Sequence, residues 1–127
     1  MDKKNLYNDF SGVTELTIKD FKNKKSDLEL THLDFKDKNG LVFFYAPWCG
    51  YCQKMVVPMS ELAIQFRYIF PIGSVNCENT KNYNLCSQYG IQSFPTIFQK
   101  TPNNMLVPYR GKYDKDTLLE YIYQNTL

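Results

Sequence analysis

The chain has little of several features that would direct a functional assignment elsewhere. Its 127 residues include a single histidine and a single tryptophan, and the formal net charge is only +2. So small a charge gives no reason to expect binding to nucleic acid or to a membrane surface. No apolar stretch approaches the roughly 20 residues that a membrane-spanning helix needs. We therefore expect no nucleic-acid partner and no membrane span.

The two ends of the chain carry no recognisable targeting signal. The first nine residues are too polar for a signal peptide, and the last four do not form an endoplasmic-reticulum retention sequence. Four cysteines without an export signal favour a redox or metal role over structural cross-linking. We expect a cytoplasmic protein, or a virus-encoded and virion-associated one, unless the chain is a piece of a secretory protein.

The composition is that of a globular protein, with 43% hydrophobic and 16% aromatic residues. The length suits one domain with a real core. Residues 1–12 are polar, and we predict a loosely ordered N-terminal extension there. Residues 13–127 are predicted to form the domain.

A Cys-x-x-Cys sequence lies at the junction of two predicted elements. The unbroken apolar run from Leu41 to Ala46 is typical of a fully buried strand. After Cys52, apolar residues recur at three- and four-residue spacings, as in an amphipathic helix: Met55, Met59, Leu62, Ala63 and Phe66. Cys49 therefore precedes a helix, where unpaired N–H groups and the helix dipole favour thiolate over thiol. We expect Cys49 to be exposed and attacking, and Cys52 to be more buried and resolving.

Other interpretations of the cysteines fit less well. A plain disulfide or two core thiols at Cys49 and Cys52 is disfavoured, because an exposed pair at a helix start is poor packing material. Zinc bound by all four cysteines is disfavoured too, because this pair follows a core strand rather than a short knuckle. We therefore expect no metal.

The remaining pattern alternates strands and helices before a closing hairpin and helix. That order predicts an α/β domain with a mixed sheet and helices on both faces. The predicted elements are strands at 13–18 and 72–75, a helix at 80–89, a hairpin of 96–99 with 105–109, and a last helix capped by Asp114 that buries Leu118, Leu119 and Ile122.

Three segments resemble the thioredoxin superfamily. Residues 44–52 look like its active-site segment, closer to a catalytic (a-type) domain of protein disulfide isomerase than to thioredoxin. Residues 89–96 are similar to the segment that holds a cis-proline opposite that site, and residues 109–111 to the loop before the last helix. The resemblance covers the chain from about Leu41 and implies a thioredoxin fold. It also implies a cis bond at Pro95 and a set of substrate-binding residues: Trp48, Gly50, Tyr51, Phe94 and Pro95.

The chain departs from this family at two places near the site. Phe43 stands where many members carry a buried acid that accepts the proton of the second cysteine, and Ser74 stands where its lysine partner would be. Deprotonation of Cys52 must therefore rely on water or another group. Tyr113 occupies the position of a mobile arginine in the isomerases, which leaves Arg110 and Lys112 as substitutes.

The first forty residues fit the family only loosely. Residues 23–27 are predicted as a charged, turn-like spacer, and the first helix of the family as very short or interrupted by an insertion. His32 is predicted to be a surface residue.

Cys77 and Cys86 are predicted to lie at a strand end and in the following helix. Their separation of nine positions is compatible with a bridge, and a similar pair occurs in some secretory isomerase domains. A disulfide and two buried thiols both remain open at this point.

These observations predict a thiol–disulfide oxidoreductase of the protein disulfide isomerase type, acting on protein thiols and disulfides. It would need no bound cofactor, but it would need a redox partner protein or glutathione to reset it. The Gly-Tyr pair between the cysteines also occurs in bacterial periplasmic isomerases, which favours oxidase or isomerase chemistry. The alternatives are a thioredoxin-like reductase and a redox-inert, chaperone-like peptide-binding domain.

Overall fold

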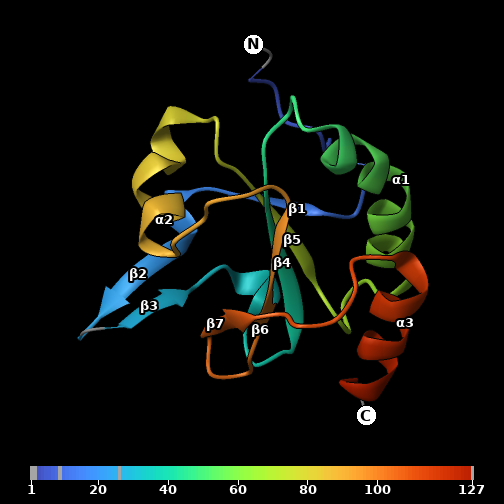
Figure 1. The fold of residues 1–127 in the computed structure, drawn as a ribbon. Helices are drawn as coiled ribbons and strands as arrows, with labels where there is room; N and C mark the ends of the chain where they lie inside the picture. The colour runs from blue at the N-terminus through green and yellow to red at the C-terminus, as the bar shows by residue number, and fades with distance from the viewer. Residues whose placement is uncertain (1–2, 9, 26, 127) are drawn as a thin grey trace.

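A computed structural model describes residues 3–8, 10–25 and 27–126. A five-stranded mixed sheet forms the centre of the molecule (Figure 1). In spatial order its strands are β1 (Thr14–Leu16), β5 (Ile72–Asn76), β4 (Gly40–Tyr45), β6 (Thr96–Lys100) and β7 (Leu106–Pro108). The first three strands run parallel, and β6 and β7 are antiparallel to their neighbours.

Strand β4 is the central strand, and all six of its residues are buried. It pairs with β5 on one side and β6 on the other, so both of its edges are hydrogen-bonded. Burial on both faces explains why its sequence is an unbroken apolar run rather than an alternating one. The strand delivers the Cys-x-x-Cys segment to one end of the sheet.

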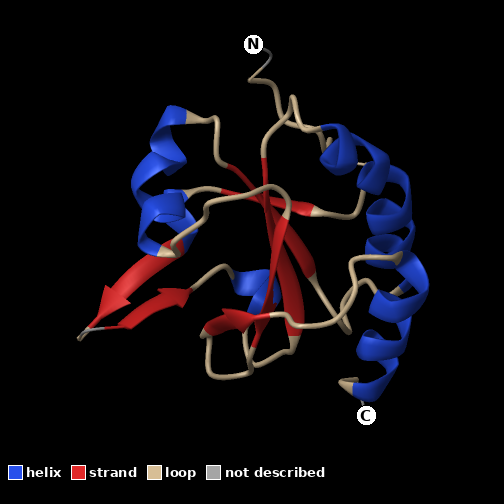
Figure 2. Ribbon diagram, viewed as in Figure 1, coloured by secondary structure: helices blue, strands red, loops and turns tan. Residues whose placement is uncertain are grey.

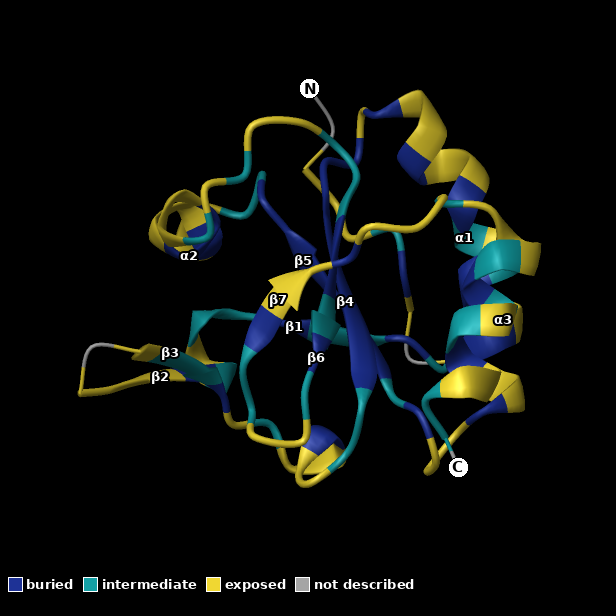
Figure 3. Ribbon diagram, turned by 60° about the horizontal axis from the view of Figure 1, so that its bottom comes forward, coloured by how far each residue is buried: buried dark blue, intermediate teal, exposed yellow. Residues whose placement is uncertain are grey.

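Helices cover both faces of the sheet, as predicted for a thioredoxin fold. Helices α1 (Gly50–Gln65) and α3 (Lys115–Gln124) lie on one side, and α2 (Tyr83–Gln88) lies on the other (Figure 2). Figure 3 shows that α1 and α3 turn buried residues toward the sheet and exposed residues outward. Two hydrophobic clusters result, one on each face.

The predicted helix faces are confirmed with one difference. Helix α1 buries Met55, Met59, Leu62 and Ala63. In α3, the side chain of Asp114 accepts a hydrogen bond from the Thr117 N–H (2.8 Å), which caps the helix as predicted. Leu118 and Ile122 are buried, whereas Leu119 packs only partly against the cluster.

Two predicted elements have different bounds in the structure. Strand β1 is shorter than 13–18, because Thr17 instead caps a 3-10 helix, η1 (Ile18–Asp20). The helix predicted over 80–89 begins as a 3-10 turn, η3 (Thr80–Asn82), and becomes α2 only at Tyr83. The hairpin of β6 and β7 lies where the sequence placed it.

The turn predicted at 23–27 is shorter in the structure: a turn is present at Lys25, whereas Asn23, Lys24 and Asp27 lie in strands. Strands β2 (Phe21–Lys24) and β3 (Asp27–Leu30) pair antiparallel, and they bury Phe21 and Leu30 against the α2 face. The described residues between β1 and β4 contain no α-helix, only η1 and a second 3-10 turn, η2 (Leu33–Phe35). The first helix was expected to be very short or interrupted by an insertion, and the structure has two 3-10 turns there with a hairpin between them.

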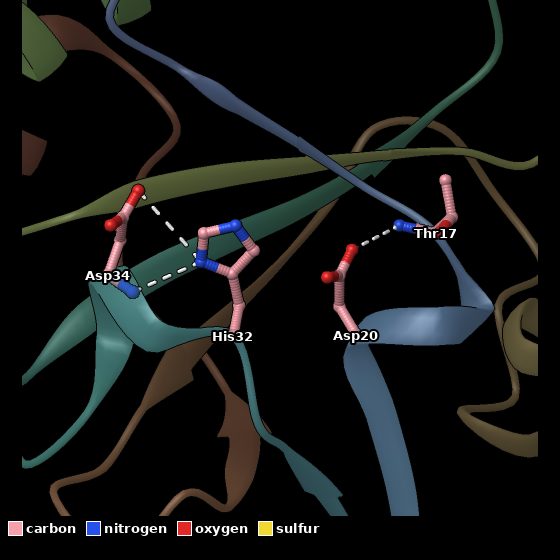
Figure 4. A network of polar contacts seen from close by, with 4 residues as sticks. All are labelled: Thr17, Asp20, His32 and Asp34. Carbon is pink, nitrogen blue, oxygen red and sulfur yellow. Dashed lines mark hydrogen bonds and ion pairs between the residues drawn. The ribbon is translucent and has the colours of Figure 1, made fainter.

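Side chains cap both short turns that flank this hairpin (Figure 4). The Asp20 carboxylate accepts a hydrogen bond from the Thr17 N–H (2.9 Å), and the His32 ring nitrogen accepts one from the Asp34 N–H (3.1 Å). His32 also packs edge-on against Phe35, so it is half-buried rather than a free surface residue. Through these contacts His32 stabilises the η2 turn.

Part of the N-terminal extension is packed, in contrast to the loose order predicted for it. Tyr7 is only 5% exposed and its ring stacks edge-on against Phe43 and Tyr45. The Leu6 N–H donates to the Tyr45 hydroxyl (3.1 Å), and the Asn76 side chain donates to the Lys3 carbonyl (3.0 Å). The prediction failed because a polar segment was judged by its average composition, whereas one aromatic ring anchors it.

Candidate functional site

The end of β4 places Cys49 at the first position before α1. Cys49 is the N-cap of α1, and its sulfur accepts a hydrogen bond from the Cys52 N–H (3.2 Å). The cap therefore presents a sulfur to backbone donors that have no partner within the helix. This is the location predicted from the sequence.

The two sulfur atoms differ in burial in the expected order, but Cys49 is less open than expected. Cys49 is 8% exposed and Cys52 2% exposed, and both are free thiols. Burial, followed by the hydrogen bond with Cys49, raises the pKa of the Cys52 thiol well above its ordinary range. Cys52 therefore stays protonated at neutral pH unless a base takes its proton.

The Phe94–Pro95 peptide bond is cis, as predicted, and lies against the cysteines. The Cys49 thiol lies 3.5 Å from the Phe94 carbonyl, to which it donates. Residues separated by 45 positions in the chain thus meet at the Cys49 sulfur. The turn at Pro95 leads directly into β6, so the rigid sheet fixes its position relative to β4.

Aromatic side chains border the cysteines on the outer surface. Trp48 is 44% exposed, packs edge-on against Phe94, and donates its ring N–H to Glu78 (2.6 Å). Tyr51 is about half exposed, and its hydroxyl donates to the Tyr113 carbonyl (3.2 Å). Gly50 is exposed, with open space where a Cβ would lie. The predicted substrate-binding residues therefore gather around one sulfur.

Cys77 and Cys86 form a disulfide, with their Cα atoms 6.0 Å apart. The bond joins the residue after β5 to α2, on the sheet face opposite the Cys49–Cys52 pair. Of the two alternatives left open by the sequence, the structure contains the bridge.

A carboxylate that the sequence analysis did not identify lies behind the site. Glu15, from β1, accepts hydrogen bonds at Oε1 from the Tyr45 hydroxyl (2.8 Å) and from Ser74 (3.0 Å). Its Oε2 atom is buried and has no hydrogen-bond partner among the described residues. Burial raises the pKa of Glu15 to about 7, although the hydrogen bonds from Tyr45 and Ser74 oppose the shift.

Tyr113, at the position of the family's mobile arginine, takes part in the structure of the last loop. Its hydroxyl accepts a hydrogen bond from the Ile97 N–H (3.0 Å) at the start of β6. The two proposed substitutes, Arg110 and Lys112, are both exposed in this loop. They lie in the predicted segment, but no contact links them to the cysteines.

The described residues provide no obvious place for a bound metal. Within them, no three histidine, cysteine or acidic side chains gather closely enough to hold an ion. The described helices also include none with both the length and the apolar composition required to cross a membrane.

Comparison with known proteins identifies the class to which this fold and site belong. The family model described as thioredoxin matches residues 13–124. The chain is therefore a member of the thioredoxin family. Within that family, its relatives include proteins named protein disulfide-isomerase, as the active-site segment had indicated.

Two such relatives come from yeast and rice. Protein disulfide-isomerase MPD1 of Saccharomyces cerevisiae is 33% identical over 98 residues, which cover 77% of this chain and 28% of the yeast protein. Protein disulfide isomerase-like 2-1 of Oryza sativa subsp. japonica is 37% identical over 91 residues, covering 68% of this chain and 24% of the rice protein. The chain thus spans about a quarter of the length of these relatives.

Solved structures share the fold at lower sequence identity. The J-Trx1 fragment of ERdj5 has a TM-score of 0.69 and 22% identity, covering 91% of this chain and 50% of that one. The first thioredoxin domain of mouse protein disulfide-isomerase A4 has a TM-score of 0.68 and 18% identity, with coverage of 92% and 77%. Both solved structures thus show that the chain shares their fold.

Proposed function

We propose that this domain is a thiol–disulfide oxidoreductase of the protein disulfide isomerase type, with Cys49 and Cys52 as its redox centre. The observation that carries the proposal is the position of the Cys49 sulfur. It caps α1, accepts the Cys52 N–H and lies beside the carbonyl of Phe94 at the cis bond. Backbone donors at a helix start stabilise a thiolate, which is the nucleophilic form of cysteine.

Exchange takes place in two displacements. The Cys49 thiolate attacks one sulfur of a substrate disulfide, forms a mixed disulfide and expels the other substrate sulfur as a thiolate. Cys52, after losing its proton, then attacks the Cys49 sulfur and expels the remaining substrate sulfur. The Cys49–Cys52 disulfide has formed and the substrate has gained two electrons. The reverse sequence oxidises a substrate dithiol, and a return of the first sulfur to the substrate rearranges its disulfides.

The substrate would bind as an extended segment beside the cis bond. Phe94 and Pro95 precede β6 and lie outside the register in which β6 pairs with β4 and β7, which suits pairing with another extended backbone. Trp48 and Tyr51 supply exposed aromatic surface on the other side of Cys49, and the open space at Gly50 admits a close approach. Because Cys49 is only 8% exposed, we expect the substrate sulfur to enter between these groups. A redox partner protein or glutathione would restore the starting state.

The test compares wild type, Cys49→Ser and the double variant Cys77→Ser/Cys86→Ser in two assays, insulin reduction and refolding of scrambled ribonuclease. We expect Cys49→Ser to abolish both activities, while the double variant retains both. Equal activity of wild type and Cys49→Ser would contradict the proposal and favour a redox-inert binding domain.

The equilibrium potential against glutathione supplies a second criterion. A value near the roughly −270 mV of thioredoxin would favour the reductase instead.

A further inference from the structure

Cys52 needs a base, and the position from which many family members supply one is occupied by Phe43. Phe43 pairs in register with Ser74 of β5, and Ser74 pairs in register with Glu15 of β1. The three residues therefore lie in one row across the sheet. The carboxylate missing from the central strand is present two strands away.

Glu15 faces the cluster that holds Cys52 rather than the opposite side of the sheet. Its hydrogen-bond donor Tyr45 and its neighbour Tyr7 both belong to that cluster, as does Cys52. The Tyr7 hydroxyl is within electrostatic reach of both ionised groups: burial raises its pKa most, and the charges of Cys52 and Glu15 raise it further. Cys52 and Glu15 thus both interact electrostatically with the same buried hydroxyl, that of Tyr7.

The other side of Glu15 opens toward water. Glu15 lines a cavity of about 430 Å³ on the side of the molecule away from the Trp48 surface. The cavity is surrounded by residues from the start of β1, the loop before β4 and the end of α1. Besides Glu15, its charged or titratable residues are Asp34, Lys38, Arg67 and Tyr68. Glu15 therefore contacts both the cluster that holds Cys52, through Tyr45, and a cavity lined by charged side chains.

We propose that Glu15 is the proton acceptor for Cys52 during release of the mixed disulfide, and that the cavity behind Glu15 returns the proton to solvent. This inference rests on the proposed function. In the step, the Cys52 S–H bond breaks and its proton passes to the Glu15 carboxylate. The electron pair of Cys52 forms the bond to Cys49, and the substrate sulfur leaves as a thiolate. Glu15 then releases its proton to cavity water.

The charge state of Glu15 suits this role near neutral pH. A group accepts and releases a proton efficiently when its pKa lies near the working pH, and that of Glu15 is raised to about 7 by burial. The groups facing it are the hydroxyls of Tyr7 and Tyr45, which remain protonated, the thiol of Cys52, and the charged side chains of the cavity. Below pH 7 the carboxylate is protonated and the step should slow.

The test follows the reaction of the reduced full chain with oxidised glutathione by the fluorescence of its one tryptophan, Trp48. Attack by Cys49 gives a phase whose rate depends on glutathione concentration, and resolution by Cys52 gives a phase that does not. For Glu15→Gln we expect the second phase to slow by about 100-fold and to lose its midpoint near pH 7. The first phase should change less than about twofold, since general-base assistance serves only the second step.

Two further variants separate a chemical role from a structural one. Glu15→Asp keeps a carboxylate and should regain at least about a tenth of the lost rate together with a titration midpoint. Glu61→Gln removes an exposed carboxylate from the far part of α1 and should leave both phases unchanged. Glu15→Gln itself removes a buried charge and keeps an oxygen acceptor for Tyr45 and Ser74, so we expect it to fold.

The outcomes distinguish this inference from the proposed function. An intact first phase with a second phase that Glu15→Gln leaves within twofold of wild type would overturn the inference alone. Equal slowing of both phases would also overturn it, because a distorted site affects both steps. Absence of the first phase in wild type would overturn the proposed function, and the inference with it.

Discussion

Cys49 and Cys52 lie in the cluster beneath α1 and α3, whereas Cys77 and Cys86 lie in the cluster on the opposite face of the sheet. Burial does not separate the two pairs, since each of the four residues is 8% exposed or less. What differs is the polarity of the neighbours. The first pair has a helix start and the Phe94 carbonyl nearby, and Cys52 interacts electrostatically with Tyr7 in the same cluster.

The second pair has aromatic surroundings and a fixed partner. Phe44, Tyr89 and Phe98 pack edge-on or tilted against one another in the same cluster, and the bridge joins a strand end to α2. Cysteines that are all buried thus differ in the polar groups around them. Four experiments test how far that contrast extends.

The largest expected effect is the trapping of a reaction intermediate by Cys52→Ser. Without a resolving thiol, the mixed disulfide at Cys49 must be broken by a second molecule, so its lifetime should rise at least about a hundredfold. Non-reducing electrophoresis and mass spectrometry after mixing with a disulfide substrate measure the adduct. The double variant Cys77→Ser/Cys86→Ser is the control and should accumulate none. An adduct of equal lifetime in both variants would erase the distinction between the pairs.

Removing the other pair should affect stability instead. Cys77→Ser/Cys86→Ser opens a loop of nine positions, and its loss should lower the free energy of unfolding by about 2.5 kcal/mol. Urea denaturation with and without reductant measures this. Reductant should destabilise wild type but not the double variant. If reductant leaves the wild-type midpoint unchanged, the bridge does not stabilise the fold.

We expect Glu15 to be the main source of the pH dependence of stability between pH 5 and pH 8. The pKa of Glu15 is raised from 4.5 to about 7 by burial, so the folded state binds a proton more tightly than the unfolded state. This stabilisation is complete below about pH 4.5 and is lost as the pH rises through 7. Allowing for the cavity on one side, wild type should lose about 2 kcal/mol between pH 5 and pH 8.

Glu15→Gln should remove that loss and be the more stable form at pH 8. Denaturant midpoints at several pH values provide the measurement, with Glu61→Gln as an exposed carboxylate for comparison. A slope that persists in Glu15→Gln would assign the pH dependence to other groups.

The smallest expected effect concerns the outer surface beside Cys49. Trp48→Phe removes the hydrogen bond to Glu78 and part of the contact with Phe94, so KM for insulin should rise about threefold while kcat stays the same. Tyr83→Phe alters a similarly exposed aromatic on α2 and should leave KM unchanged. A fall in kcat with constant KM would place Trp48 in the chemical step instead.

Features encoded within short segments were predictable from the sequence. The apolar run of β4, the Asp114 cap and the Phe-Pro-Thr turn each carry their own signal, so the positions of Cys49 and Pro95 were found. Glu15 was missed because its burial depends on the pairing of β1 with β5, 59 positions away. Tyr7 was missed because its burial depends on contacts with Phe43 and Tyr45 of β4. Average polarity and local periodicity contain no information about such long-range register.

The packing of Tyr7 against Phe43 and Tyr45 has a consequence for experiments that shorten the chain. A version beginning at Val13 would retain every residue of the family match and both cysteine pairs. It would also lack Tyr7, so water would reach Phe43, Tyr45 and the interior near Cys52. We expect such a fragment to fold and its Cys52 thiol to have a lower pKa than in the 127-residue chain, because burial is the main cause of the raised pKa and Tyr7 packs in the same cluster.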